Sequence, residues 1–253
     1  MEMCLVFLLL VAAAAAAPSS EHGVPVTPAE RERARLALQN NGLYQGDIKG
    51  YDPTDRNAVA DERLRWKGAR VPYYIDSSLT KHTKLIEAAM DNYHKLTCVK
   101  FVKRNGDEKA LKIFSGQGCW ATLGYQSYWQ QEMSLGPDCL YIGTIIHELG
   151  HTLGFNHEQT RSDRDKYVKI YWDNIEHGMD SEFIKAKPEE EILYNNFDYG
   201  SIMIYGNYAF SKDWGKLKTM EATNSQPLLD PYDKTTMTSS DAVRVNKMYN
   251  CNM

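Results

Sequence analysis

The spacing of hydrophobic and polar residues changes several times along the 253-residue chain, and each change predicts an element of secondary structure. Apolar residues recur at helical spacing over 80–96 and again over 142–153, where Gly154 is a natural stop. A capping box, with proline at the first helical position, predicts a short helix over 27–41. A last helix is predicted over 240–249, with the serine at its first position as the N-cap.

Strands are predicted between these helices. Alternating or clustered apolar residues cover 71–75, 98–102 and 111–114, and the segment 115–138, rich in glycine, serine and aromatic residues, is expected to hold further strands and loops. The polar, turn-rich stretch 44–57 is more typical of a linker than of a core. The chain after the second long helix is expected to be mixed and rich in loops.

The N-terminus carries the pattern of a secretory signal peptide. Residues 4–17 form an apolar run that ends in alanines and is too short to cross a bilayer comfortably. A basic residue before the run is missing, and an uncleaved membrane anchor is the alternative. We expect residues 1–17 to be removed, which predicts a secreted, extracellular protein that has no membrane contact afterwards. The net charge of -4 and the lack of a basic run give no indication of a nucleic-acid partner.

The cysteines fit an oxidising compartment. Cys4 leaves with the signal peptide, and an even number of cysteines remains, which predicts two disulfides with three possible connectivities. We favour Cys119–Cys139, which closes a local loop, and Cys98–Cys251, which ties the C-terminus to the core. A cysteine zinc site is the competing interpretation, and the absence of a C-x-x-C pair disfavours it.

The candidate chemistry lies in the run HELGHTLGFNH. His147 and His151 are four residues apart, so both imidazoles lie on one face of a helix and can bind one ion. Gly154 lets the chain turn sharply, which brings His157 back as a third ligand. Three such ligands favour Zn²⁺ with a position open for water, on which Glu148 can act as general base. A closed structural zinc site is the alternative, and the open position beside a carboxylate disfavours it.

A second element lies downstream, in the run SIMIYG at 201–206. In zinc peptidases with the long histidine motif a methionine in a tight turn packs beneath the metal, and Met203 fits that place. The stretch 147–167, HELGHTLGFNHEQTRSDRDKY, resembles the astacin family of metzincin peptidases, whose H-E-x-x-H-x-x-G-F-x-H-E-x-x-R-x-D-R-D hallmark it matches. The similarity extends from about residue 57 to Cys251. It departs at Ile204, where many relatives carry a histidine that is not a ligand.

The resemblance implies an α+β fold with two subdomains around a cleft. The N-terminal half would hold a twisted mixed sheet and two long helices, and the C-terminal half would be irregular. Tyr205 would be a fifth zinc ligand in the resting enzyme and would hydrogen-bond the developing oxyanion during catalysis. A substrate is expected to lie extended and to pair with an edge strand near 120–124.

The resemblance also implies a proenzyme. The run YQGDI at 44–48 is similar to the family's F-x-G-D motif, with tyrosine in place of phenylalanine, and its Asp47 would bind zinc where water should lie. A turn aspartate beside glycine is the alternative interpretation. Cleavage after Arg56 would free Asn57, whose amino group is expected to become buried and to pair with Glu158.

These inferences predict three parts, a signal peptide at 1–17, a pro-segment at 18–56 and a catalytic domain at 57–253. The predicted function is hydrolysis of internal peptide bonds by a secreted zinc metalloendopeptidase with one Zn²⁺. Its expected partners are protein or peptide substrates and an activating protease, while the sequence gives no indication of oligomeric state. Two alternatives from other classes are a catalytically silent binding protein on the same scaffold and a matrix protein that zinc stabilises.

Overall fold

The computed structural model describes residues 23–50, 62–127 and 130–251. The expected signal peptide and the expected cleavage site between Arg56 and Asn57 lie outside these ranges. Within them, no helix is long and apolar enough to cross a membrane. The described chain forms four α-helices and two sheets, joined by short 3₁₀ turns and loops.

A six-stranded sheet forms one layer of the N-terminal half, with the strand order β1-β5-β6-β4-β2-β3. Its neighbouring strands are parallel, except that β5 and β6 are antiparallel, so the predicted mixed sheet is confirmed. The strands are β1 (Ile48–Lys49), β2 (Arg70–Ile75), β3 (Lys100–Lys103), β4 (Leu111–Phe114), β5 (Cys119–Thr122) and β6 (Gln131–Leu135).

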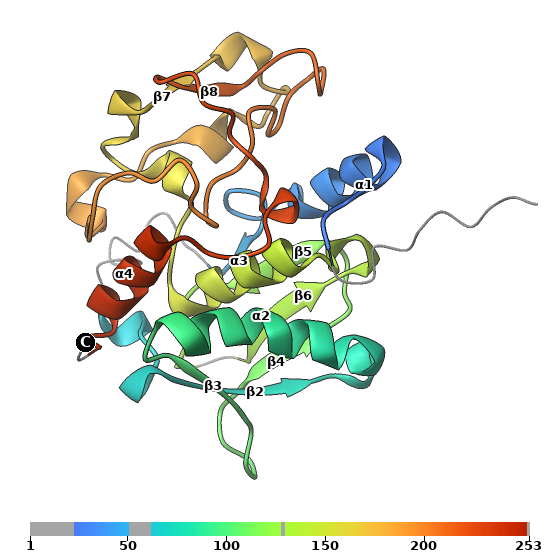
Figure 1. Cartoon of the computed structure of the whole chain (residues 1–253), viewed down its shortest axis with the longest axis vertical. Helices are drawn as coiled ribbons and strands as arrows, with labels where there is room; N and C mark the ends of the chain where they lie inside the picture. Colours follow the sequence, from blue (N-terminus) through green and yellow to red (C-terminus); the bar gives the residue numbers. More distant parts are fainter. Residues whose placement is uncertain (1–22, 51–61, 128–129, 252–253) are drawn as a thin grey trace, which may run out of the picture.

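Two long helices, α2 (Thr83–Leu96) and α3 (Ile142–Leu153), lie side by side across one face of this sheet (Figure 1). The α2 helix is amphipathic and turns residues such as Ile86 and Met90 inward. The α3 helix is different, because every residue from its second position to its end is buried. Any polar side chain on α3 must therefore find its partners inside the protein.

The C-terminal half has less regular structure, as predicted. It holds a two-stranded sheet of β7 (Val168–Ile170) and β8 (Met220–Ala222), and it ends in α4 (Ser239–Met248) (Figure 1). Its core is a separate cluster around Phe183 and Phe210, distinct from the cluster between the sheet and the helices. The first cluster also takes in residues of the C-terminal half, such as Met203 and Val245. The mixed sheet, the two long helices and the second cluster confirm the expected α+β fold with two subdomains.

The cysteines of the described ranges form two disulfides, Cys98–Cys251 and Cys119–Cys139, the two pairs favoured from the sequence. The last helix, however, begins earlier than predicted. Its N-cap is Thr238, whose side chain accepts a hydrogen bond from the backbone N–H of Asp241 at 3.0 Å, and not the serine at 240. Thr238 and Asp241 form a capping box, whereas the third residue after the serine at 240 is a valine that cannot complete one. Asp241 also accepts long-range hydrogen bonds from Ser201 and Ile202, which fix it at this position.

The expectation that 44–57 resembles a linker is wrong for its described first part. Gln45, Asp47 and Ile48 are 2%, 0% and 1% exposed. Polar side chains are expected at the surface when they lack partners, but those of Gln45 and Asp47 find partners far away in the sequence, His157 and His147. The preceding helix, α1 (Pro28–Leu38), is docked as well, through the buried Ala34 and Leu38.

Candidate metal centre

Helix α3 and the turn after it place three histidines at one point. His147 and His151 lie one helical turn apart on α3. Gly154 ends the helix with a φ of 105°, in the left-handed region that favours glycine, and its N–H is bonded to the last turn. The chain then reverses, and His157 returns to within reach of the other two, as the sequence predicted.

The three imidazoles converge through their Nε2 atoms. The Nε2 of His147 lies 3.0 Å from that of His151 and 3.2 Å from that of His157. Asp47 joins them, with its Oδ2 at 3.0 Å from the Nε2 of His147 and its Oδ1 at 3.3 Å from the Nε2 of His151. All four ligand atoms lie within 4.8 Å of one another, and the four side chains are buried.

The partners of the opposite ring nitrogens fix how the histidines are protonated. The Nδ1 atoms of His147 and His151 lie 2.8 Å and 2.7 Å from the backbone oxygens of Ile202 and Phe155. A carbonyl oxygen only accepts, so each Nδ1 carries the hydrogen and each Nε2 turns a lone pair toward the centre. Converging lone pairs repel one another unless a cation lies between them. Three imidazole nitrogens and one carboxylate form a donor set typical of Zn²⁺, so these residues fit a single zinc ion.

Glu148 lies next to the first ligand and is fully buried. Neither of its carboxylate oxygens has a hydrogen-bond partner among the described residues. Burial raises the pKa of Glu148 well above its ordinary value, and the charge of Asp47 raises it further. A buried carboxyl group without partners is costly for folding, which makes this position beside the metal site a candidate for a functional role.

Tyr205 lies against the same centre. Its hydroxyl donates a short hydrogen bond to Oδ2 of Asp47, and its ring centroid is 4.4 Å from that of His157. Burial raises the pKa of Tyr205 well above its ordinary value, and the charge of Asp47 adds to this, so the phenol keeps its proton. The structure therefore places Tyr205 as a hydrogen-bond donor at the metal site.

Met203 lies in the turn beneath α3. The Met203 side chain packs directly against Gly150 of α3, and a Cβ atom on that glycine would come within 2.4 Å of the Met203 sulfur. The same turn carries the Ile202 oxygen that orients His147. Two charged side chains that the sequence analysis did not single out hold this turn. Asp241 accepts from Ser201 Oγ at 2.6 Å and from the Ile202 N–H at 2.9 Å.

The second charge is Lys234, whose Nζ donates to the backbone oxygens of Ser201 and Ile204 at 2.7 Å and 2.9 Å. Burial lowers the pKa of Lys234 to about 8, while nearby aspartates act in the opposite direction. Lys234 ends the run DPYDK at 230–234, and nothing in that run distinguishes a lysine that holds a turn from one at the surface.

Glu158 lies behind the site, with its carboxylate 4% exposed. Arg244 binds both of its oxygens, at 2.6 Å and 2.7 Å, and Arg161 adds a contact at 3.2 Å. Burial raises the pKa of Glu158 to about 7, and the two arginines oppose that rise. The expected partner, the amino group of Asn57, lies outside the described residues, so that pairing stays a prediction.

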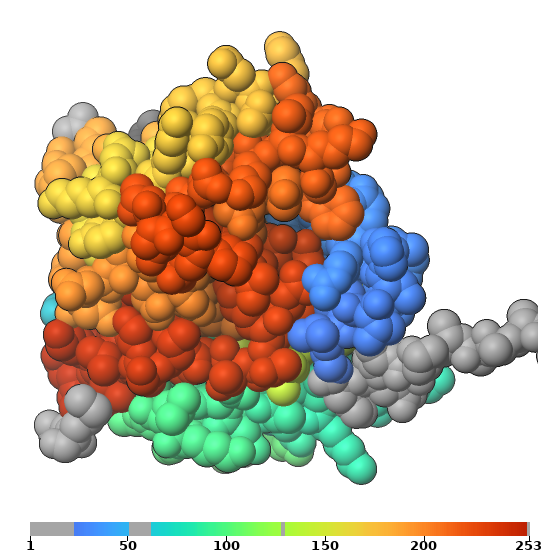
Figure 2. All heavy atoms as spheres, turned by 45° about the horizontal axis from the view of Figure 1, so that its top comes forward, coloured from blue at the N-terminus to red at the C-terminus, as the bar shows by residue number. Residues whose placement is uncertain are grey.

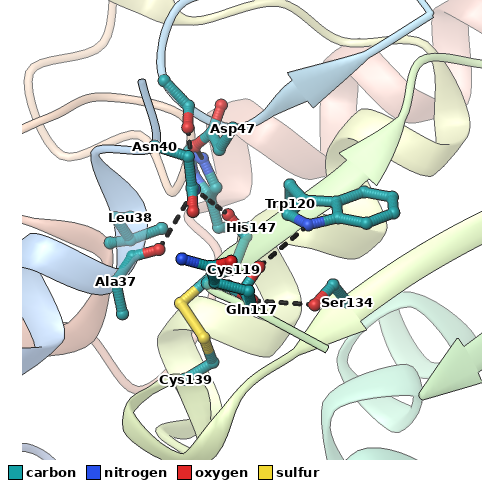
Figure 3. The surroundings of a disulfide bond; sticks show 12 residues. Ala37, Leu38, Asn40, Asp47, Gln117, Cys119, Trp120, Ser134, Cys139 and His147 are labelled. Atoms are coloured by element: carbon teal, nitrogen blue, oxygen red, sulfur yellow. Dashed lines mark hydrogen bonds and ion pairs between the residues drawn. A yellow bond between two sulfur atoms is a disulfide. The ribbon is translucent and has the colours of Figure 1, made fainter. Parts of the chain in front are cut away.

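The N-terminal segment docks over the site. Figure 2 shows this segment, in blue, packed against the C-terminal half, in orange and red. Arg31 pairs with Asp233, and β1 pairs parallel with β5 in the register Ile48↔Ala121. Asn40 connects the N-terminal segment to the sheet. Its Nδ2 lies 3.1, 2.8 and 2.9 Å from the backbone oxygens of Ala37, Gly46 and Cys119, the last of which belongs to β5 (Figure 3).

The strand expected to receive substrate, β5, is thus covered on its outer edge. Gln45 is a further residue that the sequence analysis named only as part of a motif. Its side-chain oxygen lies 2.8 Å from Nδ1 of His157. The motif at 44–48 gave a role to Asp47 alone, and no signal in the sequence linked Gln45 to His157, 112 residues away.

The sequence profile described as "Astacin (Peptidase family M12A)" matches residues 58–250 of this chain. The chain is 38% identical over 236 residues to zinc metalloproteinase nas-6 of Caenorhabditis elegans, covering 88% of this chain and 67% of that protein. It is 39% identical over 215 residues to astacin-like metalloprotease toxin 1 of Loxosceles intermedia, covering 83% of this chain and 81% of the toxin.

Among solved structures, the chain is similar to high choriolytic enzyme 1 of the medaka Oryzias latipes, a hatching-enzyme zinc protease. The TM-score is 0.66 at 36% sequence identity, and the match covers 74% of this chain and 94% of that one.

Proposed function

The chain belongs to the astacin family of zinc metalloproteinases, and we propose that it is a secreted endopeptidase made as a proenzyme. One observation carries the proposal. Three buried imidazole nitrogens and Asp47 converge on a single point, and Glu148 lies beside them without a partner among the described residues. The two disulfides support secretion, because such bonds persist in oxidising compartments.

In this proposal His147, His151 and His157 hold the zinc ion. A Zn²⁺ ion held there supplies Lewis acidity toward a water molecule and the scissile carbonyl. Glu148 takes the proton of the attacking water and then delivers it to the leaving amine, for which a raised pKa is suitable. Tyr205, which keeps its phenolic proton, donates a hydrogen bond to the developing oxyanion.

The substrate is proposed to bind along β5, whose outer edge β1 covers in this structure. An extended peptide that replaces β1 would pair with the backbone of residues 120–124, so binding would depend on main-chain hydrogen bonds. The backbone N–H groups of Ala121 and Leu123 already donate to the N-terminal segment. Their acceptors are the backbone carbonyl oxygens of Asp47 and Lys49, at 3.0 Å and 3.1 Å. They are groups that a substrate backbone would take over.

The N-terminal segment is proposed to be an inhibitory pro-segment, 18–56, which precedes the catalytic domain at 57–253. Asp47 supports this, because its carboxylate lies against the histidines at the place where a catalytic water would have to bind. An activating protease that cleaves after Arg56 would release it. The freed amino group of Asn57 is then proposed to pair with Glu158, which lines a cavity beside the site.

The test is cleavage of a quenched peptide library by protein processed at Arg56, with and without a zinc chelator. Cleavage that the chelator abolishes and added zinc restores is expected. A folded, zinc-loaded, processed protein that cleaves nothing would favour a silent binding scaffold. Unprocessed protein should be inactive and should gain activity on Asp47→Ala, and a variant as silent as its parent would refute the role of Asp47.

A further inference from the structure

The three histidines of the metal centre are oriented by different parts of the chain. Ile202 and Phe155, which orient His147 and His151, both belong to the catalytic half and act through backbone oxygens. The Nδ1 of His157 instead lies 2.8 Å from the side-chain oxygen of Gln45, a residue of the proposed pro-segment. The orientation of the third ligand therefore depends on a segment that processing would remove.

Gln45 is held in place for this contact. Its side chain is 2% exposed, and its backbone has a φ of 52°, in the left-handed region that residues other than glycine rarely adopt. A strained backbone persists only where its surroundings impose it. The hydroxyl of Thr160, which donates to the His157 backbone oxygen at 2.9 Å, lies 3.4 Å from the Gln45 oxygen, so the Gln45 side chain is also packed against this residue.

We propose that Gln45 is a positioning residue of the proenzyme, which orients His157 and thereby strengthens zinc binding before activation. This inference rests on the proposed function and deepens its regulation. Asp47 blocks the site, whereas Gln45 acts on the far side of a ligand ring and never reaches the metal position. Outer contacts of this kind set the tautomer and direction of a metal-binding histidine. Processing therefore removes both a ligand and the acceptor that aligns another ligand.

The experiment compares full-length zinc-loaded proproteins and measures how fast zinc passes to a chelating dye. Gln45→Met removes the acceptor at nearly constant volume and is expected to speed zinc release about tenfold to a hundredfold, the usual effect of losing an outer contact. Gln39→Met makes the same chemical change at the end of α1, where the side chain contacts Arg35, and is expected to match the parent.

A spectroscopic readout separates orientation from mere packing. In ¹⁵N-histidine-labelled proprotein, the Nδ1–H signal of His157 should be protected from exchange with solvent and should lose that protection in Gln45→Met. The corresponding signals of His147 and His151 should stay. The parent measured before and after processing provides the same comparison without any substitution, in case the variant folds poorly.

The processed proteins supply a built-in control, because residue 45 leaves with the pro-segment. Parent and Gln45→Met then give mature enzymes of identical sequence, which should have equal activity. A lower activity from the variant would show that its proprotein had folded incorrectly. Unchanged zinc release together with an unchanged His157 signal in Gln45→Met would overturn the inference. The proposed function would stand in that case if Asp47→Ala still activates the proprotein and the processed parent still cleaves peptides.

Discussion

Gly46 lies between Gln45 and Asp47, where the proposed pro-segment packs against Phe210 of the second hydrophobic cluster. A Cβ atom there would come within 2.8 Å of Cζ of Phe210 and 3.1 Å of the Leu38 oxygen. The residue also has a φ of +86°, which side chains rarely adopt. We predict that Gly46→Ala loosens the docking of the segment and makes the unprocessed protein active.

The chain offers a matched control that separates the two causes. Gly42 has the same φ of +86°, but nothing lies within 4 Å of its hypothetical Cβ atom. Alanine at a left-handed position costs about 1–2 kcal/mol, and forcing a methyl group into a packed site adds about 1–3 kcal/mol. Gly42→Ala should show the strain alone, and Gly46→Ala should show both. Their difference corresponds to roughly 5- to 150-fold in the docking equilibrium, at 1.4 kcal/mol per factor of ten.

The assay is the initial rate of peptide cleavage by each unprocessed protein, divided by its own rate after processing. Both glycines leave with the pro-segment, so the processed enzymes are identical and the ratio reports docking only. Gly46→Ala should give the larger ratio, Gly42→Ala a smaller one, and the parent the smallest. Equal ratios for the two variants would refute the argument from the Phe210 contact.

Three further predictions concern stability. Gly150→Ala would press a methyl group on the Met203 sulfur and should lower the unfolding free energy by about 1–3 kcal/mol, measured in denaturant, while an unchanged midpoint would contradict that contact. Burial lowers the pKa of His147 from 6.5 to about 4, so the unfolded chain binds more protons between these values, and metal-free protein should lose stability as the pH falls through them. The same pH dependence in His147→Gln would show that this group is not responsible. Replacing Cys98 and Cys251 by serine opens a link across 153 positions and should cost about 4–5 kcal/mol by chain entropy, and a loss below about 1 kcal/mol would speak against that mechanism.

Local spacing explains what the sequence could predict. His147, His151 and Glu148 lie within five residues on one helix, so helical geometry alone brings them together. Gly154 and His157 follow from the same short motif, because a left-handed glycine reverses the chain over three residues. Helices α2 and α3 and strands β2 and β4 were also predictable, since each has its own apolar pattern, whereas β1 lies in a stretch that was expected to be a linker.

Long-range contacts explain what could not be predicted. Gln45 is a polar residue in a turn-rich stretch, and only its partner far along the chain makes it a buried residue. Asp241 and Lys234 are similar cases. Each hydrogen-bonds backbone groups of the turn at 201–204 from another part of the chain, and no local pattern indicates such a bond. A sequence pattern shows which side chains are polar, but their partners are fixed by the fold.

The central claim is that three histidines hold zinc while Glu148 activates water, and Glu148→Gln tests it most directly. Zinc content and peptide turnover would be measured on the same processed preparation, beside the parent. We expect one zinc ion per chain in both proteins and a turnover lower by about 10²- to 10⁴-fold in the variant, the usual contribution of a general base. Turnover close to that of the parent, with zinc retained, would contradict it.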